Sequence, residues 1–299
     1  MDSNFIKGII PPIITPIQDD ERLNESVLRA HIDFMIEGGI AGILAFGSNG
    51  EFYMLEEDEM EGILKVIIDQ VKGRIPVYMG VGAIRTSKCV RLARLGVRLG
   101  AQCVSVLQPM FIKPTEDELL SHFKTIAQSV SGVPVLLYNN PGRTGYAISQ
   151  AVVEKLAHSV PNIVGMKDSS GDMTETMEFI RRNRDTGFKV LVGRDTLIYS
   201  GFTVGAVGAV CTTANYLPAL VCSIYSRYIA DDTAGALDAQ FRLNPIRIAM
   251  DKSSFPVAAK DYSNILGRAV GEPFLPNKHS PQAQFENLRE ELRKGGFLT

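Results

Sequence analysis

The stretch Asn162–Asp172, NIVGMKDSSGD, contains the pattern that decides the fold. Ile163–Met166 is a short apolar run, and such a run predicts a buried β-strand. Lys167 comes next, followed by four polar or glycine residues that are typical of a turn. Asp172 and Glu175 then have the spacing of a helix-capping box. The stretch therefore predicts a strand, a turn and the start of a helix, with a lysine at the mouth of the strand.

The same order of strand and helix recurs along most of the chain. Short apolar runs predict strands at Gly8–Thr15, Ile40–Phe46, Ile75–Gly80, Gln102–Leu107, Val133–Tyr138, Ile163–Met166, Lys189–Val192 and Ala206–Cys211. Segments with helical periodicity lie between them, for example at Ser26–Glu37, Glu56–Val71, Ser87–Leu99 and Glu116–Val130. Such alternation implies parallel strands joined by right-handed crossovers. Eight units over roughly 230 residues favour a closed (β/α)8 TIM barrel over an open sheet.

The domain organisation follows from where this alternation stops. No linker rich in proline, serine or glycine interrupts it, so we expect one α/β barrel domain over residues 1–230. Residues 231–299 show helical patterns only and are expected to form a C-terminal helical extension of the same domain. Pro11 and Pro12 fall inside the first predicted strand, where proline removes a donor from the ladder. We therefore expect this strand to be short or irregular.

Composition excludes several classes of function. The 299 residues carry a formal net charge of −2, and no basic stripe or basic amphipathic helix predicts binding to nucleic acid or to a membrane surface. No apolar run approaches the ~20 residues that span a bilayer, and the N-terminus lacks a signal-peptide pattern. The four cysteines have no metal-like spacing, and the four histidines stand alone. We expect a cytoplasmic protein without a cofactor or metal site.

The ends of the strands supply candidate catalytic residues. Active sites of (β/α)8 barrels lie at the C-terminal ends of the strands. This rule selects residues at or after the ends of the second, fifth, sixth and seventh strands, among them Ser48, Asn49, Tyr138, Arg143, Lys167, Gly193, Arg194 and Asp195. A lysine amine is a nucleophile only in its neutral form, which burial favours, and with carbonyl compounds it forms Schiff bases. A phenol can move the protons that this chemistry needs. The small polar turn of residues 47–50 offers donors to a carboxylate, so a 2-oxo acid is the expected substrate.

Each candidate also has an ordinary structural interpretation. A lysine just past a strand is usually a solvated loop charge, and Tyr138 could be a core tyrosine with a satisfied hydroxyl. The serine and asparagine of the turn could be turn formers, and Arg143 could be the partner of a surface ion pair. Their convergence on one rim of the predicted barrel favours the functional interpretation.

With these residues assembled, the chain resembles the superfamily of pyruvate-dependent class I aldolases that contains dihydrodipicolinate synthase and N-acetylneuraminate lyase. The motifs GIIPPIITP, GSNGEF, YNNPGRTG, GMKDSSGD and GAVGAVCTTAN carry the resemblance, at Gly8–Pro16, Gly47–Phe52, Tyr138–Gly145, Gly165–Asp172 and Gly205–Asn215. It covers nearly all of the sequence. It implies a cofactor-free Schiff-base lyase that takes pyruvate and an aldehyde as partners, assembled as a homotetramer built from two dimers.

The resemblance also implies a role for each candidate. Lys167 would form the Schiff base, and Tyr138 would shuttle protons. Ser48, together with the backbone of Asn49, would hold the pyruvate carboxylate and hydrogen-bond the tyrosine. Arg143 matches the arginine that in the synthase branch binds the carboxylate of the second substrate. The other residues expected to bind substrate are Ser169, Gly193 and Val210.

Departures from the synthase pattern bear on the reaction. Synthases have two adjacent tyrosines after the fourth strand, the second completing a hydroxyl relay, whereas this chain has Met110 and Phe111. Phenylalanine can neither donate a hydrogen bond nor pass a proton. Asn49 stands where synthases usually have threonine. The motif spellings are more similar to those of 4-hydroxy-2-oxoglutarate and 2-keto-3-deoxy sugar-acid aldolases. Arg143 points to the synthase branch, and an acceptor aldehyde carrying a carboxylate would reconcile the two sets of features.

The favoured interpretation is a lyase that reversibly cleaves a 4-hydroxy-2-oxo or 2-keto-3-deoxy acid to pyruvate and an aldehyde. One alternative is 4-hydroxy-tetrahydrodipicolinate synthase (dihydrodipicolinate synthase), which condenses pyruvate with aspartate semialdehyde. A dehydratase that acts on a 2-keto-3-deoxy acid through the same lysine is another. The last alternative is a pyruvate-binding relative without catalytic activity. The joint presence of the lysine, tyrosine, serine and arginine argues against it.

Overall fold

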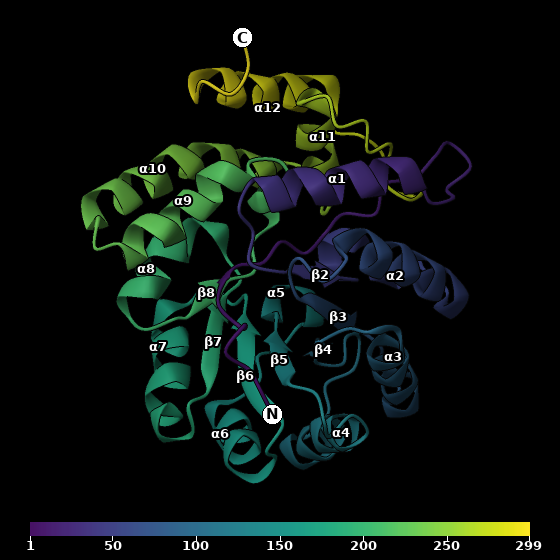
Figure 1. Ribbon diagram of the computed structural model, residues 1–299, viewed down its shortest axis with the longest axis vertical. Helices are drawn as coiled ribbons and strands as arrows, with labels where there is room; N and C mark the ends of the chain where they lie inside the picture. The colour runs from purple at the N-terminus through teal and green to yellow at the C-terminus, as the bar shows by residue number, and fades with distance from the viewer.

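A ring of parallel strands forms the centre of the computed structural model, which describes residues 1–299 (Figure 1). The strands are β1 (Gly8–Ile9), β2 (Ile43–Ala45), β3 (Val77–Val81), β4 (Cys103–Leu107), β5 (Val135–Asn139), β6 (Ile163–Asp168), β7 (Lys189–Val192) and β8 (Gly208–Ala209). Hydrogen-bonded neighbours follow the order β1-β8-β7-β6-β5-β4-β3-β2, and every pair is parallel. The predicted (β/α)8 barrel is confirmed.

The ring closes between β1 and β2 through an irregular seam. One parallel bridge joins Pro12 to Leu44. Around it, Ile13 N donates to Leu44 O and Leu44 N donates to Pro11 O, each over 3.0 Å. Regular pairing of β1 ends at Ile9, because the two prolines that follow have no N–H to donate. The expectation of a short, irregular first strand is confirmed, although its predicted range to Thr15 was too long.

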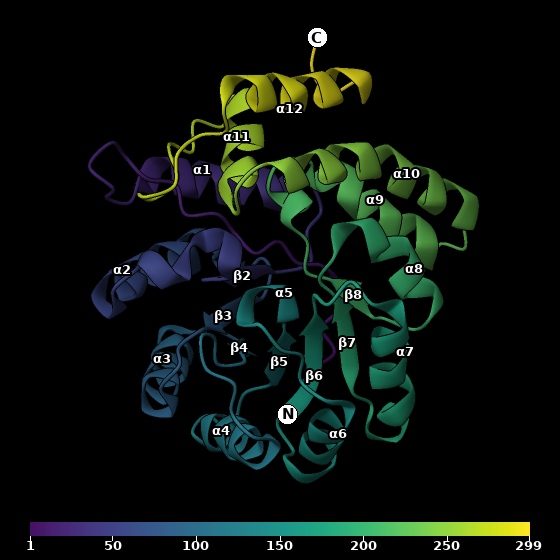
Figure 2. The ribbon, with the colours of Figure 1, turned by 180° about the vertical axis from the view of Figure 1, so that it is seen from behind.

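Helices surround the barrel, one after each strand. They are α1 (Glu25–Glu37), α2 (Glu57–Val71), α3 (Thr86–Leu99), α4 (Glu116–Gln128), α6 (Gln150–Ser159), α7 (Met173–Arg182), α8 (Ile198–Thr203) and α9 (Pro218–Ile229). A further short helix, α5 (Pro141–Thr144), lies in the loop after β5. Figure 2 shows the helices as an outer layer around the strands. The four helices predicted from periodicity begin within one residue and end within two residues of their predicted bounds.

The capping box predicted at the start of α7 is half correct. Asp172 Oδ1 accepts hydrogen bonds from the backbone N–H groups of Thr174 and Glu175, as an N-cap residue should. The Glu175 side chain does not return to the cap. It instead accepts a 2.6 Å hydrogen bond from Gln150 Nε2 of α6, so it joins two neighbouring helices.

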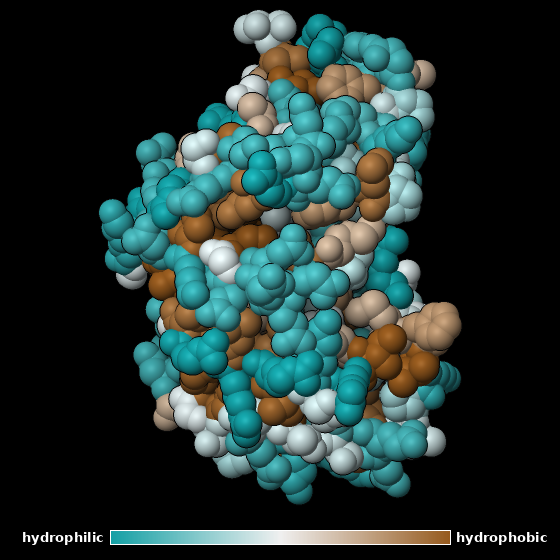
Figure 3. Space-filling model, turned by 90° about the vertical axis from the view of Figure 1, so that its right-hand side faces the viewer, coloured by the Kyte–Doolittle hydropathy of each residue, from teal (hydrophilic) through white to brown (hydrophobic).

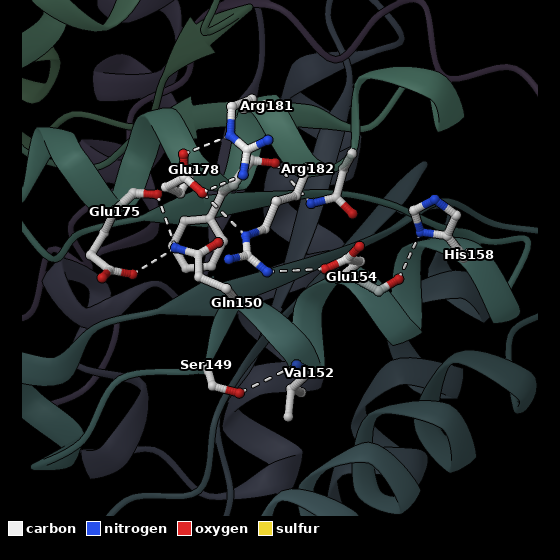
Figure 4. Close-up of polar contacts among 11 residues, drawn as sticks. Ser149, Gln150, Val152, Glu154, His158, Glu175, Glu178, Arg181 and Arg182 are labelled. Atoms are coloured by element: carbon white, nitrogen blue, oxygen red, sulfur yellow. Dashed lines mark hydrogen bonds and ion pairs between the residues drawn. The ribbon is translucent and has the colours of Figure 1, made fainter.

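Polar side chains continue this link between α6 and α7 at the surface (Figure 4). Arg182 Nη1 lies 3.3 Å from a Glu154 carboxylate oxygen, and Arg182 Nε lies 3.2 Å from Glu178. At the end of α6, His158 Nδ1 lies 2.8 Å from the carbonyl oxygen of Glu154. Of these three contacts, only the Arg182–Glu154 pair joins the two helices, and its side chains are 38% and 44% exposed, so it adds little to stability.

The chain after α9 is helical, with α10 (Thr233–Ala249), α11 (Val257–Ile265) and α12 (Gln282–Lys294). Figures 1 and 2 show these helices gathered on one side of the barrel, next to α1 and α9. A fully buried ion pair ties them to the barrel, because Lys260 Nζ of α11 lies 2.8 Å from Glu51 Oε2 in the loop after β2. The two side chains are 1% and 0% exposed. Lys260 also donates to the carbonyl oxygen of Glu272.

Apolar side chains fill the space inside the barrel. The interior cluster consists of Ile6, Ile10, Leu44, Tyr78, Cys103, Leu136, Leu191 and Val210. Larger apolar layers separate the strands from the helices. All four cysteines are free. No helix combines the length and the apolar character that crossing a bilayer requires.

Candidate active site

One pocket of about 580 Å³ opens at the C-terminal ends of the strands. Its volume lies within the ordinary range for small-molecule sites. All the residues predicted to be catalytic or to bind substrate line it, namely Ser48, Asn49, Tyr138, Arg143, Lys167, Ser169, Gly193 and Val210. The structure thus brings the eight residues together, while the role of each stays a prediction.

Lys167 is placed by strand pairing. It lies within β6, in register with Tyr138 of β5 and Leu191 of β7. The predicted strand ended at Met166, and this was wrong, because regular pairing continues through Asp168. The lysine side chain is 4% exposed, and Nζ lies 4.0 Å from the centroid of the Tyr138 ring. Two adjacent strands therefore hold the amine over the phenol without help from a flexible loop.

The Tyr138 hydroxyl has two polar neighbours besides the lysine. It accepts a 2.8 Å hydrogen bond from Asn140 Nδ2, and it lies 3.4 Å from Ser48 Oγ. Burial alone would raise the pKa of Tyr138. The charge of Lys167 and the hydrogen bonds from Ser48 and Asn140 outweigh burial, so the pKa of Tyr138 lies below its ordinary value. A phenol with a lowered pKa loses its proton more readily near neutral pH, and the phenolate that results can accept a proton from a substrate.

The turn after β2 is held from both ends. Ser48–Gly50 forms a single 3₁₀ turn, and Thr15 Oγ1 donates a 2.8 Å hydrogen bond to the carbonyl oxygen of Gly50. Glu51 follows with a φ of 54°, which a residue with a side chain adopts only when its surroundings hold it there. The buried ion pair to Lys260 supplies that restraint. The C-terminal helices thereby fix the turn that presents Ser48 and Asn49 to the pocket.

Asn49 is oriented by its neighbour across the pocket. Its Nδ2 donates a 2.7 Å hydrogen bond to Thr212 Oγ1, whereas its buried Oδ1 has no hydrogen-bond partner in the protein. Thr212 also lines the pocket. The asparagine side chain therefore contributes a polar group to the wall next to the expected carboxylate position.

Arg143 is the pocket arginine that is free to bind an anion. Three arginines line the pocket. Arg194 and Arg247 both pair with Asp251, at 2.7 and 2.8 Å. Arg143 forms no ion pair, and its guanidinium carbon lies 4.1 Å from the centroid of the Phe255 ring. Stacking on an aromatic ring orients the guanidinium and leaves its N–H donors for a ligand.

Sequence reasoning missed one whole wall of the pocket. This wall belongs to the C-terminal extension and consists of Arg247, Met250, Asp251, Ser253, Ser254, Phe255, Pro256 and Ala258. The rule of strand ends cannot find it, because these residues follow no strand. The hydrogen bond between Asn140 and the phenol was also not predicted, although Asn140 lies two residues after Tyr138 in the YNNPGRTG motif. That short spacing was the only signal available.

Met110 and Phe111 place no hydroxyl in this pocket. Phe111 is 94% exposed, and its φ of 69° turns the chain outward after β4. Met110 lines a neighbouring cavity of about 210 Å³, together with Ser48 and Arg143. Within one chain, the phenol therefore has Ser48 and Asn140 as its hydroxyl and amide partners.

Comparisons with known proteins agree with this geometry. Residues 5–292 match the model of the dihydrodipicolinate synthetase family. The chain is similar to the 4-hydroxy-tetrahydrodipicolinate synthase of Methanopyrus kandleri, with 33% identity over 98% of this chain and 97% of the relative. It is likewise similar to an enzyme of that name from Thermus thermophilus, with 33% identity over 98% of each chain.

Solved structures extend the likeness to the fold. Dihydrodipicolinate synthase from Aquifex aeolicus is 30% identical, with a TM-score of 0.93 over 98% of this chain and 99% of that one. YagE from Escherichia coli K12, a member of the same family solved in complex with pyruvate, is 28% identical, with a TM-score of 0.93 over the same shares. Because the family model covers nearly the whole sequence and these relatives match it from end to end, the chain belongs to the dihydrodipicolinate synthetase family and is a lyase of the class I aldolase type.

Proposed function

We propose that this lyase cleaves a 4-hydroxy-2-oxo acid, including 2-keto-3-deoxy acids, reversibly to pyruvate and an aldehyde. The observation that carries the proposal is the pair formed by Lys167 and Tyr138. A buried amine lies 4.0 Å from the ring centroid of a phenol whose pKa is lowered. This pairs a nucleophile for the ketone with a group that can accept and return a proton.

The proposed reaction proceeds through an imine. Lys167 Nζ attacks the C2 ketone, and Tyr138 donates the proton with which the carbinolamine hydroxyl leaves as water. The Tyr138 oxygen then takes the proton of the C4 hydroxyl as the C3–C4 bond breaks. The bonding electron pair moves into the iminium to form an enamine, and the aldehyde leaves. Tyr138 returns its proton to C3, and water hydrolyses the imine to pyruvate and the free amine.

The outer part of the pocket supports an aldehyde that carries a carboxylate. Arg143 has no ion-pair partner and faces the pocket next to Phe255. Hydroxyl groups of Ser253 and Ser254 line the same side and can bind substrate hydroxyls. With the 2-oxo acid carboxylate at the Ser48 turn, the free guanidinium would bind a second carboxylate at the far end of the substrate.

Synthesis of 4-hydroxy-tetrahydrodipicolinate is the second candidate. The curated relatives that carry this name are 33% identical to the chain over nearly its full length. Arg143 also suits aspartate semialdehyde, which carries a carboxylate. The exposed Phe111, which brings no hydroxyl to the phenol, and Asn49 in place of threonine favour the cleavage reaction.

Borohydride trapping tests the chemistry that both candidates share. The protein is incubated with pyruvate, reduced and digested, and the mass added to each peptide is located. We expect the adduct on Lys167 and no adduct in the variant Lys167→Met. An unmodified Lys167, in a run that labels a known class I aldolase, would refute the Schiff-base mechanism.

A comparison of aldehydes separates the two candidates. Condensation with pyruvate is measured for glyoxylate and for aspartate semialdehyde, in the original protein and in Arg143→Met. We expect the higher kcat/KM with glyoxylate, and a raised KM for the aldehyde but not for pyruvate in the variant. Arg194→Met is the matched control, because that arginine already pairs with Asp251. A clear preference for aspartate semialdehyde would assign the synthase reaction.

A further inference from the structure

One hydroxyl lies among the apolar side chains inside the barrel. Ser105 is on β4, two residues after Cys103, which belongs to the interior cluster. Alternate residues of a strand face the same side, so Ser105 faces inward as well. Its side chain is 3% exposed, and its Oγ has no hydrogen-bond partner within the protein. Buried hydroxyls almost always have a partner, so this one calls for an explanation.

A small cavity adjoins the serine and reaches the catalytic residues. Ser105, Ser48 and Tyr138 all line it. Gly80, which pairs with Ser105 in register, has no side chain to fill it. The cavity volume is about 10 Å³, the room that the centre of one water molecule needs. Apart from Tyr138, no residue that lines the cavity can titrate.

The polar groups around this cavity have unused hydrogen-bonding capacity. Ser48 Oγ lies 3.4 Å from the Tyr138 hydroxyl, which is longer than an ordinary hydrogen bond between two oxygens. Ser105 Oγ can both donate and accept. A water needs two to four polar partners to occupy a buried site, and two serine hydroxyls and the phenol supply them.

We propose that this cavity binds one water molecule, that Ser105 holds this water, and that the water hydrogen-bonds the hydroxyl pair of Ser48 and Tyr138. Ser105 is then a positioning residue for Tyr138. The water accepts a hydrogen bond from Ser105 and donates one toward the catalytic pair. The effect of this water on turnover rests on the proposed function of Tyr138 as the group that moves protons. The presence of the water does not rest on that function.

The effect on proton transfer has a defined sign. A hydrogen bond donated toward the phenolate stabilises it, so loss of the water raises the pKa of Tyr138. Lys167 of β6 faces the phenol directly. The other charged groups of the active-site pocket are Arg143, Arg194, Asp195, Arg247 and Asp251, and none of them lines the small cavity. Removing the Ser105 hydroxyl therefore changes the surroundings of the phenol without touching another charge.

The exchange of pyruvate methyl protons for deuterium in D₂O measures this step without a second substrate. The imine on Lys167 loses a C3 proton to the Tyr138 oxygen, the phenol exchanges with solvent, and a deuteron returns to C3. In Ser105→Ala we expect the acid limb of the pH profile to move to higher pH and the exchange rate there to fall about tenfold, equal to one pKa unit. Ser105→Thr retains the hydroxyl and should restore the profile.

Two further measurements decide between a water site and a loosened barrel. Cys103→Ala, on the same strand and in the same interior, should leave the pH profile unchanged. A high-resolution crystal structure should show a water within hydrogen-bonding distance of Ser105 Oγ, and this water should be lost in Ser105→Ala. Absence of that water, an unchanged profile in Ser105→Ala, or an equal shift in Cys103→Ala would overturn the proposal. Failure of borohydride trapping would instead refute the proposed function. The crystal structure would still show whether the cavity holds a water.

Discussion

At the scale of single residues, the site depends on two neighbours across one strand pair. Lys167 and Tyr138 are in register on β6 and β5, so their separation is fixed by the barrel itself. The charge of the lysine lowers the pKa of the phenol against the effect of burial. The amine and the proposed proton shuttle therefore depend on each other electrostatically as well as by position.

The two roles can be separated by Tyr138→Phe. Loss of a positioned acid–base group slows proton transfer by about 100-fold or more, so exchange of the pyruvate methyl protons should fall by that factor. Borohydride should still label Lys167 after a long incubation, because the nucleophile is untouched. The exchange rate is followed by proton NMR. A variant that exchanges at the original rate would show that another group moves the proton.

The positions of strand ends predicted Ser48, Asn49, Tyr138, Arg143, Lys167 and Gly193, because parallel strands place such positions on one rim. The family resemblance implied Ser169 and Val210. The sequence could not predict Ser253, Ser254 or Phe255 in the outer wall. Their place depends on how α10 and α11 pack on the barrel, and no periodicity encodes that. Nor could the sequence predict a role for Ser105, because a single serine in an apolar strand indicates a polar site only when a cavity lies beside it.

At the scale of elements, α1 and α4 each bury a histidine on the face toward the core. Burial lowers the pKa of His31 and of His122 to about 4 in each case. Thr86 Oγ1 lies 2.9 Å from His122 Nδ1, while His122 Nε2 has no partner in the protein. Both rings are therefore neutral in the folded protein over a range in which the unfolded chain binds protons.

The free energy of unfolding should fall as the pH drops from about 6.5 to about 4. In that window the unfolded chain binds more protons than the folded protein, so stability rises with pH and levels off above it. Each histidine contributes a slope of up to about 1.4 kcal/mol per pH unit. Urea unfolding at several pH values measures the slope, and His122→Leu should reduce it. An identical slope in that variant would contradict the conclusion that His122 has a lowered pKa in the folded protein.

At the scale of the whole molecule, the C-terminal extension is part of the candidate active site. It supplies one wall of the pocket, and Lys260 holds Glu51 at the end of the Ser48 turn. Burial lowers the pKa of Lys260, and the carboxylate of Glu51 partly offsets this. The ion pair thus connects the extension to the turn that is expected to bind the 2-oxo acid.

Breaking this pair should be strongly destabilising. Lys260→Met leaves the Glu51 carboxylate buried and uncompensated, which costs about 3–5 kcal/mol of unfolding free energy. The double variant with Glu51→Gln should recover much of the loss, because no charge is then left unpaired. Urea unfolding of both single variants and the double variant forms the cycle. Additive effects would show that the two groups do not act as a pair.

The assembly also belongs to this scale, and we propose a homotetramer. Figure 3 shows hydrophobic side chains reaching the surface on the side of the barrel where α1 to α4 lie. After β4, Phe111 and Ile112 are 94% and 46% exposed, and a subunit contact would cover them. Light scattering should give four times the chain mass, and Phe111→Asp should lower it. An unchanged tetramer in that variant would place the contact elsewhere.

The irregular seam between β1 and β2 makes the barrel unequal around its circumference. Elsewhere ladders of hydrogen bonds join the strands, but the seam has a single bridge beside two prolines and one further backbone hydrogen bond, from Ala41 N to Ile9 O. Local opening begins where the fewest backbone bonds must break. Pro12 and Ser48 line the active-site pocket from the two strands that meet at this seam. We therefore expect local opening to begin beside the candidate active site, where it would also admit solvent to the proposed imine on Lys167.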